Sequence, residues 1–425
     1  MFGQNDSFYD LRQNANYDSI VMDEKCLYTQ DNPKGDLNYV KTLLYTWKLM
    51  KTDSVRFSSD HSGHMLQPLS YVGDIQSINW FSSKNMAPYP QLKDTAYTNK
   101  FKRRKLNYHT AKDFILQNAK DKQIIMFNEG HDRPQTRAFV VSILADLKKN
   151  GYVYLALETF DERGNLKELD CTTGIYTQEP MSGEVVREGL RLGFKLIPYE
   201  HVNQPTQMND IYTPKRNKID EREVGEAKNL YNRIKTKTGI EKTVVLAGYG
   251  HIAKTYDSTF TSMAMYFKKF SGINPLAIDQ TTLLEENEHS AYANKLLNIM
   301  LNKDSIFAFT PKEAKMFGVD STAYDIYVYH PHTTYSHNRP TWLITSAEKY
   351  FVSIEVPKSI KPVLVQAFVK TEIKSYEDYK IKIPCDQTFY SENNNVWLVL
   401  RKGKEYKIIY RDDKNRIVFK KDIKT

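Results

Sequence analysis

Short apolar runs alternate with segments of helical spacing between residues 120 and 345. The segment after the first run, for example, places Phe139, Ile143 and Leu147 on one helical face. Strands that alternate with helices form a parallel sheet with crossover helices. The pattern therefore predicts an α/β domain with a mostly parallel sheet over residues 111–345. Its strands are expected at 124–127, 152–157, 195–198, 243–247, 276–278, 306–309 and 326–329.

The segment before this domain has a different character. Residues 1–110 are polar and rich in tyrosine. The spacing of their apolar residues predicts one amphipathic helix near 37–50, and the stretch around 58–90 favours loops. We therefore expect a mainly helical or irregular N-terminal region.

The last part of the chain changes period again. Residues 346–425 alternate apolar and polar side chains, as half-buried strands do. A turn at Gly403 is expected to pair 396–400 with 406–410, and a second turn leads to 416–419. The pattern predicts a small antiparallel β module resembling a sandwich.

Composition narrows the class of protein and partner. The chain has 425 residues and a formal net charge of +9, which permits acidic partners without requiring them. The dense basic run at 100–105 is more typical of a solvated face than of a nucleic-acid site, so no nucleic-acid partner is expected. Cys26, Cys171 and Cys385 lie far apart, which argues against a thiolate metal site and a disulfide framework.

The beginning of the sequence bears on location. It shows no basic segment followed by an apolar one, and the chain has no apolar stretch long enough to span a membrane. We therefore expect a cytoplasmic protein, or an exported or periplasmic one if a signal peptide precedes the printed sequence.

Acidic and imidazole side chains follow one expected strand after another. The carboxyl ends of parallel strands meet at one edge of a sheet, where open α/β folds bind their ligands. Clustered carboxylates and imidazoles shift one another's pKa, which suits acid–base chemistry near neutral pH. The residues concerned are Glu129, His131, Glu158, Glu200, His201, His251 and Asp279.

The turn after the first strand suggests a division of roles. A neutral His131 can take a proton from water or a substrate hydroxyl, with Glu129 or Glu158 orienting the ring. The helix that starts at Pro134 offers free backbone N–H groups to an anion. Arg133 and Arg137 suit binding of a phosphate or carboxylate, although surface ion pairs explain them equally well.

Three further features have structural explanations. Asp220 and Glu223 resemble a capping box at a helix start, which leaves Arg222 to face either the crevice or solvent. The histidine pair His61 and His64 lacks acidic neighbours, so a loop is favoured over a metal site. The same holds for His330, His332 and His337.

Residues 120–345 resemble the erythromycin esterase-like, Tiki/TraB and haem-uptake group of bacterial α/β proteins. The counterparts of its motifs are NEGH at 128–131, Glu158, Arg222 and Glu223 ahead of EAKN at 226–229, and GYGH at 248–251. The resemblance covers about half of the chain and lies in the order of the motifs. Asn128 replaces the leading glycine of the first motif.

The resemblance implies a hydrolase of an ester or amide acting on a small molecule or peptide. His131, Glu129, Glu158 and His251 would be catalytic, and Arg133, Arg137, Glu200, His201 and Arg222 would bind substrate. Members of the group work without metal or with a divalent metal, whose ligands here would be His131, His251, Glu129 and Glu158.

Two alternatives remain open. The same fold can hold haem, a metal or another ligand without turnover, and an axial histidine with some of the 29 tyrosines would suit haem. A degenerate enzyme serving as an interaction scaffold is the other alternative, and Asn128 in place of glycine is its support. The partner of the C-terminal module is unknown.

Overall fold

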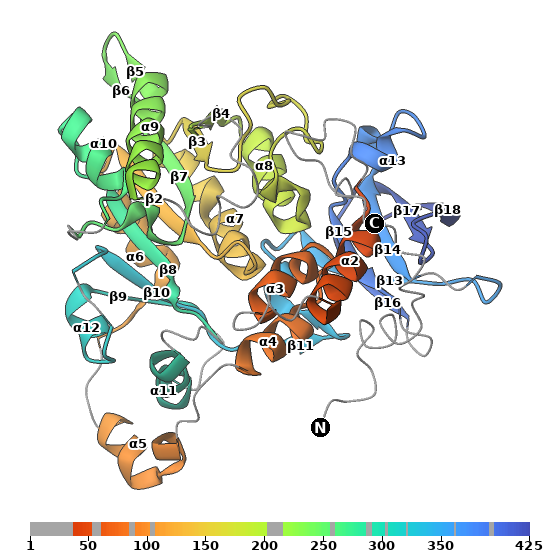
Figure 1. Ribbon diagram of the computed structural model, residues 1–425, viewed down its shortest axis with the longest axis horizontal. Helices are drawn as coiled ribbons and strands as arrows, with labels where there is room; N and C mark the ends of the chain where they lie inside the picture. Colours follow the sequence, from red (N-terminus) through yellow and green to blue (C-terminus); the bar gives the residue numbers. More distant parts are fainter. Residues whose placement is uncertain are drawn as a thin grey trace.

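The computed structural model describes residues 37–52, 61–84, 90–102, 107–201, 216–255, 260–285, 291–301, 305–319, 322–360, 363–390 and 395–425. Figure 1 shows helices and an eight-stranded sheet on one side and an antiparallel β module on the other. The N-terminal helices Tyr39–Thr52, His61–Tyr71 and Ile75–Lys84 lie between them, whereas Thr95–Lys102 lies beside Ala291–Leu301. Among the described helices, none is both long enough and apolar enough to cross a membrane.

The eight-stranded sheet confirms the predicted α/β class. The last six strands in its spatial order run parallel, and the second strand in the order pairs antiparallel with both of its neighbours. The strand predicted at 306–309 therefore exists but runs against its neighbours. The spatial order is β1 (His109–Thr110), β9 (Phe307–Phe309), β10 (Ile326–Tyr329), β8 (Leu276–Leu283), β2 (Ile124–Glu129), β7 (Thr243–Gly248), β3 (Tyr154–Leu157) and β4 (Lys195–Pro198).

Both faces of this sheet are covered by helices, which explains why β2 and β7 are buried along their whole length. Alternate residues of β2 point to opposite faces. Ile125 and Phe127 pack with α6 (Ala111–Ala119), α7 (Pro134–Lys149) and α8 (Pro180–Arg191). Ile124 and Met126 pack with α9 (Arg216–Ile234) and α10 (Met263–Ser271). A third core surrounds α11 (Ala291–Leu301) and α12 (Pro311–Lys315).

The N-terminal region is more helical than its composition suggested. The predicted helix near 37–50 is confirmed as α2 (Tyr39–Thr52). The loops predicted at 58–90 are wrong, because α3 (His61–Tyr71) and α4 (Ile75–Lys84) lie there. Met65 and Leu69, one helical turn apart, join the core beside α7, and the helix continues through Pro68. The short helices η2 (Pro90–Lys93) and α5 (Thr95–Lys102) follow.

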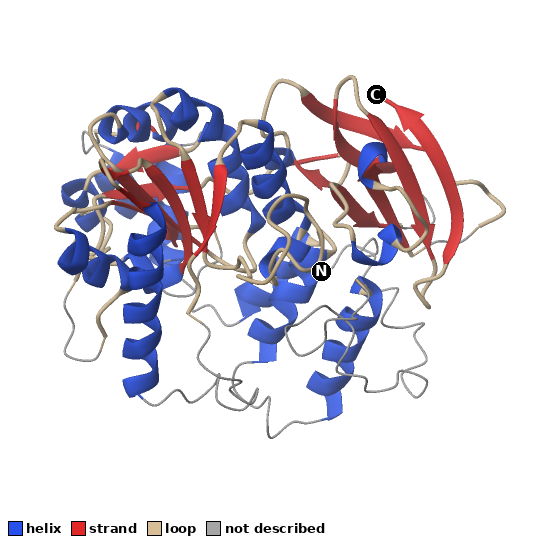
Figure 2. Ribbon diagram, turned by 90° about the horizontal axis from the view of Figure 1, so that it is seen from above, coloured by secondary structure: helices blue, strands red, loops and turns tan. Residues whose placement is uncertain are grey.

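The C-terminal module is antiparallel, as predicted, and has two sheets that Figure 2 shows apart from the parallel sheet. Ile354 and Leu398 of one sheet share a core with Val365 and Ile408 of the other. One sheet pairs β13 (Lys349–Ile354) with β16 (Val396–Arg401). The other has the order β15 (Asp386–Phe389), β14 (Leu364–Val369), β17 (Glu405–Arg411) and β18 (Ile417–Lys424).

One predicted pairing in this module is wrong. The turn at Gly403 connects β16 to β17, which belong to different sheets, so 396–400 pairs with β13 and not with 406–410. Each strand thereby turns its apolar side toward the common core. The hairpin of β17 and β18 is confirmed. Strand β15 escaped prediction because its four residues, DQTF, are mostly polar.

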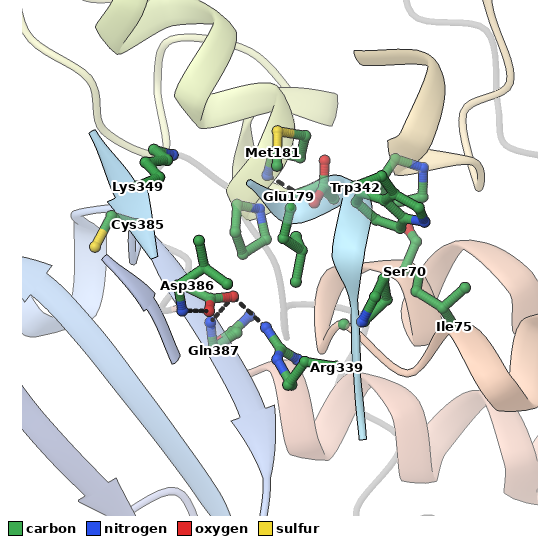
Figure 3. A pocket seen from close by; sticks show the side chains of 16 residues that line it. Ser70, Ile75, Glu179, Met181, Arg339, Trp342, Lys349, Cys385, Asp386 and Gln387 are labelled. Carbon is green, nitrogen blue, oxygen red and sulfur yellow. Dashed lines mark hydrogen bonds and ion pairs between the residues drawn. The ribbon is translucent and has the colours of Figure 1, made fainter. Parts of the chain in front are cut away.

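Buried polar contacts join the parts of the molecule. Arg339 and Asp386 form an ion pair with both side chains buried, and the Gln387 side chain donates a hydrogen bond to the carbonyl of Tyr71 in α3. Figure 3 shows Arg339, Asp386 and Gln387 around a small pocket whose opposite wall carries Glu179, at the start of α8. The helical region, α8 and the β module are thus packed together around Glu179.

Candidate active site

Three strands deliver acidic or small residues to one point at the carboxyl edge of the sheet. Glu129 is the last residue of β2 and pairs in register with Gly248, the last residue of β7. Glu158 follows β3, and its backbone N–H donates to the carbonyl of Leu246 in β7. The parallel register therefore makes neighbours of residues that lie far apart in sequence, as the strand-end pattern predicted.

Gly248 allows two side chains to converge over the end of β7. A Cβ atom on Gly248 would lie 2.6 Å from Cε1 and Nε2 of His131 and 3.2 Å from Oε2 of Glu158. Its backbone N–H donates to the same oxygen of Glu158 at 2.5 Å. A larger residue would displace the imidazole, so the close approach explains why glycine ends this strand.

His131 is oriented by a chain of buried charges. Its Nδ1 lies 3.2 Å from Oε1 of Glu129. Arg137 is fully buried on the first turns of α7, and its Nε and NH2 groups each donate a hydrogen bond to the Glu129 carboxylate at 2.9 Å. The NH1 group of Arg137 lies 3.3 Å from Oε2 of Glu179. Because Nδ1 faces a carboxylate, the proton of a neutral His131 is placed there and Nε2 is left as the base.

The two carboxylates that contact Arg137 differ in their ionisation. Burial alone would raise the pKa of Glu129, but the Arg137 guanidinium and the contact with His131 outweigh it and hold the pKa below 4.5. At Glu179 burial prevails over Arg137 and two backbone N–H donors, and it raises the pKa to about 7. Glu129 is therefore the ionised partner of His131.

Two tyrosines enclose the imidazole of His131. The ring of Tyr176 stacks on it with centroids 4.0 Å apart, and Tyr249 meets it edge to face at 5.4 Å. The hydroxyl of Tyr249 donates to Asp132 at 2.8 Å. Tyr249 has a φ of 31°, a left-handed value that is uncommon outside glycine. Backbone strain of this kind is common at functional sites.

His251 forms a second histidine–carboxylate pair. It lies in the short helix η5 (Tyr249–Ile252) that follows β7, and its Nδ1 is 2.6 Å from Oε1 of Glu223 in α9. Glu223 is itself fixed by the backbone N–H of Met263 at 2.6 Å. Burial alone would lower the pKa of His251, but the carboxylates of Glu158 and Glu223 outweigh it and raise the pKa above 6.5.

Arg222 joins the acidic side chains of three elements. It binds Glu200 through Nε and NH2, and its NH2 group also lies 2.7 Å from Glu158 and 2.9 Å from Glu226. Its NH1 group is 3.1 Å from Nε2 of His251. Arg222 therefore faces the cluster of carboxylates and His251 and not the solvent. Burial would raise the pKa of Glu158, but His251, Arg222 and His131 keep it well below its usual value.

The described residues form two groups that could be considered for a metal. In each group of three, the donor atoms lie within 4.8 Å of one another. Arg222 already occupies the space among the carboxylates of the second group. In the first group, Nδ1 of His251 and both oxygens of Glu226 have no hydrogen-bond partner among the described residues. Nδ1 nevertheless lies only 2.6 Å from Oε1 of Glu223, which is closer than two ligands of one tetrahedral metal ion lie to each other. The groups are Glu223, Glu226 and His251, and Glu158, Glu200 and Glu226. Neither arrangement fits a divalent metal.

The metal set expected from the resemblance and the haem alternative fit no better. Both oxygens of Glu129 are held by Arg137, so Glu129 is not available beside His131, His251 and Glu158 as a ligand. The ring of His131 lies close over Gly248 and is stacked on Tyr176, and Nε2 of His251 accepts from Arg222 at 3.1 Å, so neither ring has the open space that a porphyrin needs. We therefore derive no chemistry through a metal or haem.

Other residues expected at the site have different surroundings. Arg133 donates to Asn79 and Ser82 of α4 at 3.0 and 2.6 Å and is buried, so it links the helical region to the sheet domain. His201 packs against Gly225, where a Cβ atom would lie 2.1 Å from the ring. The side chain of Arg137 contacts protein carboxylates and has no exposed surface for a substrate.

Asn128 links β2 to β8 and to the segment that follows β7. Its side-chain nitrogen donates to the carbonyl of Tyr249 at 3.1 Å and to Asp279 of β8 at 2.7 Å. Its side-chain oxygen accepts from the backbone N–H of Gln280 at 2.6 Å. A glycine at 128 would lose all three bonds, so the departure from the family motif has a structural reason. Asp279, expected at a strand end, lies inside β8.

The structure adds three residues that the sequence reasoning passed over. Tyr176 and Glu179 come from a segment without periodicity, where only the proline after Glu179 marked a helix start. Glu226 lies one turn after Arg222 and is completely buried. Burial, offset only in part by Arg222, raises the pKa of Glu226 well above its usual value.

The structure also bears on the motifs that the sequence explained as structural. The capping box predicted at Asp220 is wrong, because α9 begins at Arg216 and Glu223 contacts His251. His61 and His64 belong to the helix α3 and not to a loop. The structure describes their backbone but not their side chains. His330 and His332 follow β10, as discussed below. Cys26 and part of the run at 100–105 also lie outside the described residues.

Replacing Glu179 by glutamine should remove a pH-dependent loss of stability. Because the folded-state pKa is raised from 4.5 to about 7, the favourable contribution is complete below pH 4.5 and is lost as the pH rises through 7. Between pH 4.5 and 7, the free energy of unfolding of the wild type should therefore fall by about 3 kcal/mol relative to that of the variant. Urea unfolding of both proteins at several pH values measures it, and a pH-independent difference would contradict the assignment.

No protein-family model matches the chain, and no curated protein does. Two solved structures are similar to parts of it. The type III effector HopBA1 is 15% identical, with 44% of this chain and 94% of the effector covered and a TM-score of 0.29. A structure described as bacterial protein toxins is 13% identical, with 57% of each chain covered and a TM-score of 0.31.

Proposed function

We propose that the protein is a hydrolase of an ester or amide and that it works without a metal. The observation that carries the proposal is the pair of imidazoles on either side of Glu158. Each imidazole presents Nδ1 to a buried carboxylate, at 3.2 Å for His131 and 2.6 Å for His251. At His131 the carboxylate that orients Nδ1 leaves Nε2 free for proton transfer, whereas at His251 the nitrogen Nε2 accepts from Arg222 at 3.1 Å.

His131 is assigned the role of general base. Nε2 takes a proton from water while the water oxygen bonds to the carbonyl carbon of the substrate. Glu129, kept ionised by Arg137, stabilises the resulting imidazolium. The rings of Tyr176 and Tyr249 restrict the imidazole to this orientation. These contacts supply the positioning that general-base catalysis requires.

His251 is assigned a role in stabilising the oxyanion through Arg222. Its Nδ1 lies 2.6 Å from Oε1 of Glu223, and its Nε2 accepts a hydrogen bond from NH1 of Arg222 at 3.1 Å. Arg222, fixed in this way, adds positive charge where the carbonyl oxygen becomes negative. When the tetrahedral intermediate collapses, the bond from the carbonyl carbon to the leaving group breaks, and the His131 imidazolium donates to that group the proton that it took from water. His131 is then neutral again.

Activity that survives metal removal is the expected result of the first test. Purified protein, before and after dialysis against a chelator, would be assayed on a panel of p-nitrophenyl esters and anilides together with elemental analysis and a visible spectrum. Because Arg222 supplies positive charge among Glu158, Glu200 and Glu226, the treated protein should keep its rate. Activity that is lost on chelation and restored by a divalent metal would contradict the proposal.

The same assay addresses the two alternatives. A coloured preparation with a haem absorption band would favour a binding protein over a hydrolase. A colourless and inactive wild type would favour the interaction scaffold. The substitution that first supported the scaffold, Asn128 in place of glycine, has a structural reason in its bonds to Tyr249, Asp279 and Gln280. We therefore rank hydrolysis first.

A further inference from the structure

A cavity lies apart from the two histidine–carboxylate pairs. It has a volume of about 260 Å³ and lies among α7, the segment after β10 and the short helix η6 (Thr341–Leu343). Its walls include Gln135, Phe139, His330, His332, Trp342 and Thr345. Trp342, labelled in Figure 3, also borders the small pocket there.

Polar atoms in this cavity lack protein partners. Within the described part of the chain, neither the side-chain oxygen nor the side-chain nitrogen of Gln135 has a hydrogen-bond partner. The same is true of Nε2 of His330, Nε2 of His332 and Oγ1 of Thr345. Gln135, His330 and Thr345 are 5%, 3% and 8% exposed, so their side chains are almost out of reach of bulk water. Buried polar groups in proteins are nearly always paired, with protein or with ordered water, so several unpaired groups of residues that line one cavity leave hydrogen-bonding capacity for water or a ligand there.

The cavity favours an uncharged molecule. Its lining includes no lysine, arginine, aspartate or glutamate among the described residues. Burial lowers the pKa of His330 to about 3, so this ring is neutral near pH 7. A charged ligand would lose its hydration without a compensating ion pair, and such burial is strongly unfavourable.

Aromatic walls indicate that the ligand has a flat body. The indole N–H of Trp342 donates to Oγ1 of Thr333 at 3.2 Å, which fixes the ring plane. Phe139 meets His330 edge to face at 5.9 Å between centroids. Aromatic faces bind heterocycles by stacking. The carboxamide of Gln135 offers a donor and an acceptor side by side, the arrangement with which glutamine pairs to the edge of a purine.

We infer that this cavity binds an uncharged planar heterocycle, a purine base or nucleoside, with Gln135 reading its edge and Trp342 stacking on its face. Gln135 lies on the same first turns of α7 as Arg137, which fixes Glu129. The inference does not depend on the hydrolase proposal, because none of the side chains assigned to hydrolysis lines the cavity.

Calorimetric titration with adenine and adenosine tests the inference, with glucose as a polar ligand that has no aromatic ring. The wild type should bind a purine probe and bind glucose more weakly. Gln135→Leu and Trp342→Leu should each weaken binding about tenfold or more. Ser142→Ala is the matched control on the same wall, because its hydroxyl already donates to the carbonyl of Phe139 at 2.6 Å, and it should bind as the wild type does.

Thermal unfolding of each variant shows that it is folded. Gln135→Leu removes an unpaired polar group, so its midpoint should not fall below that of the wild type. The inference is overturned if neither purine binds the wild type at millimolar concentration, since water would then fill the cavity. It is also overturned if glucose binds as tightly as the purines, or if folded Gln135→Leu binds them unchanged.

Discussion

Replacing His131 by asparagine is expected to lower kcat/KM by about 10²–10⁴-fold on any ester or anilide that the wild type cleaves. Asparagine keeps polarity at Nδ1 but cannot accept a proton. The loss should appear mainly in kcat, because the imidazole acts in the transition state and binds substrate little. Steady-state kinetics on the best substrate of the panel provides the measurement.

Two further substitutions make this result specific. His337→Asn is the matched control, since His337 is exposed, stacks on Trp397 in the β module and has a φ of 53° that asparagine readily adopts. It should leave kcat/KM unchanged. Glu129→Gln should lower kcat less than His131→Asn, because it weakens orientation of the base without removing it. A His131→Asn protein that is folded and as active as the wild type would contradict the assignment of His131 as the general base.

The sequence predicted where these acidic and imidazole side chains come together, because strand ends carry that information locally. Glu129, His131 and Glu158 directly follow apolar runs, and a parallel sheet must bring such positions to one edge. The contacts made there depend on register and on helices packed from outside. The pairing of Glu129 with Gly248, which sets the position of His131, follows from the order β2, β7, β3, and that order cannot be deduced from the runs.

The sequence did not reveal the roles of residues that act through another side chain. Arg137 looked like a ligand for an external anion, yet the fold buries it between Glu129 and Glu179. Glu223 looked like a cap because Asp220 precedes it by three residues, the spacing of a capping box. The helix in fact starts at Arg216, and Glu223 faces His251. Local spacing indicates which motif is possible, whereas tertiary packing selects the partner.

The largest loss of stability is expected from Arg137→Met. Arg137 is fully buried and neutralises Glu129, with Glu179 also in contact, so its removal leaves two buried carboxylates without their cation. Removing one partner of a buried ion pair typically lowers the free energy of unfolding by about 3–5 kcal/mol. Urea unfolding near pH 8 should show a decrease of this size. Arg191→Met is the matched control, because the Arg191 side chain is 49% exposed, and it should change stability by about 1 kcal/mol or less.

The pH dependence of the Arg137→Met protein distinguishes lost charge compensation from lost packing. Without the guanidinium, burial raises the folded-state pKa of Glu129, which Arg137 now keeps below 4.5, and raises that of Glu179 further. Both carboxyls then bind protons more tightly in the folded state, so the variant loses stability as the pH rises. The deficit relative to the wild type should therefore be smaller at pH 5 than at pH 8. Adding Glu129→Gln and Glu179→Gln to Arg137→Met should restore part of the loss at pH 8. A deficit that is equal at both pH values and unchanged by these glutamines would show that Arg137 stabilises the fold by packing alone.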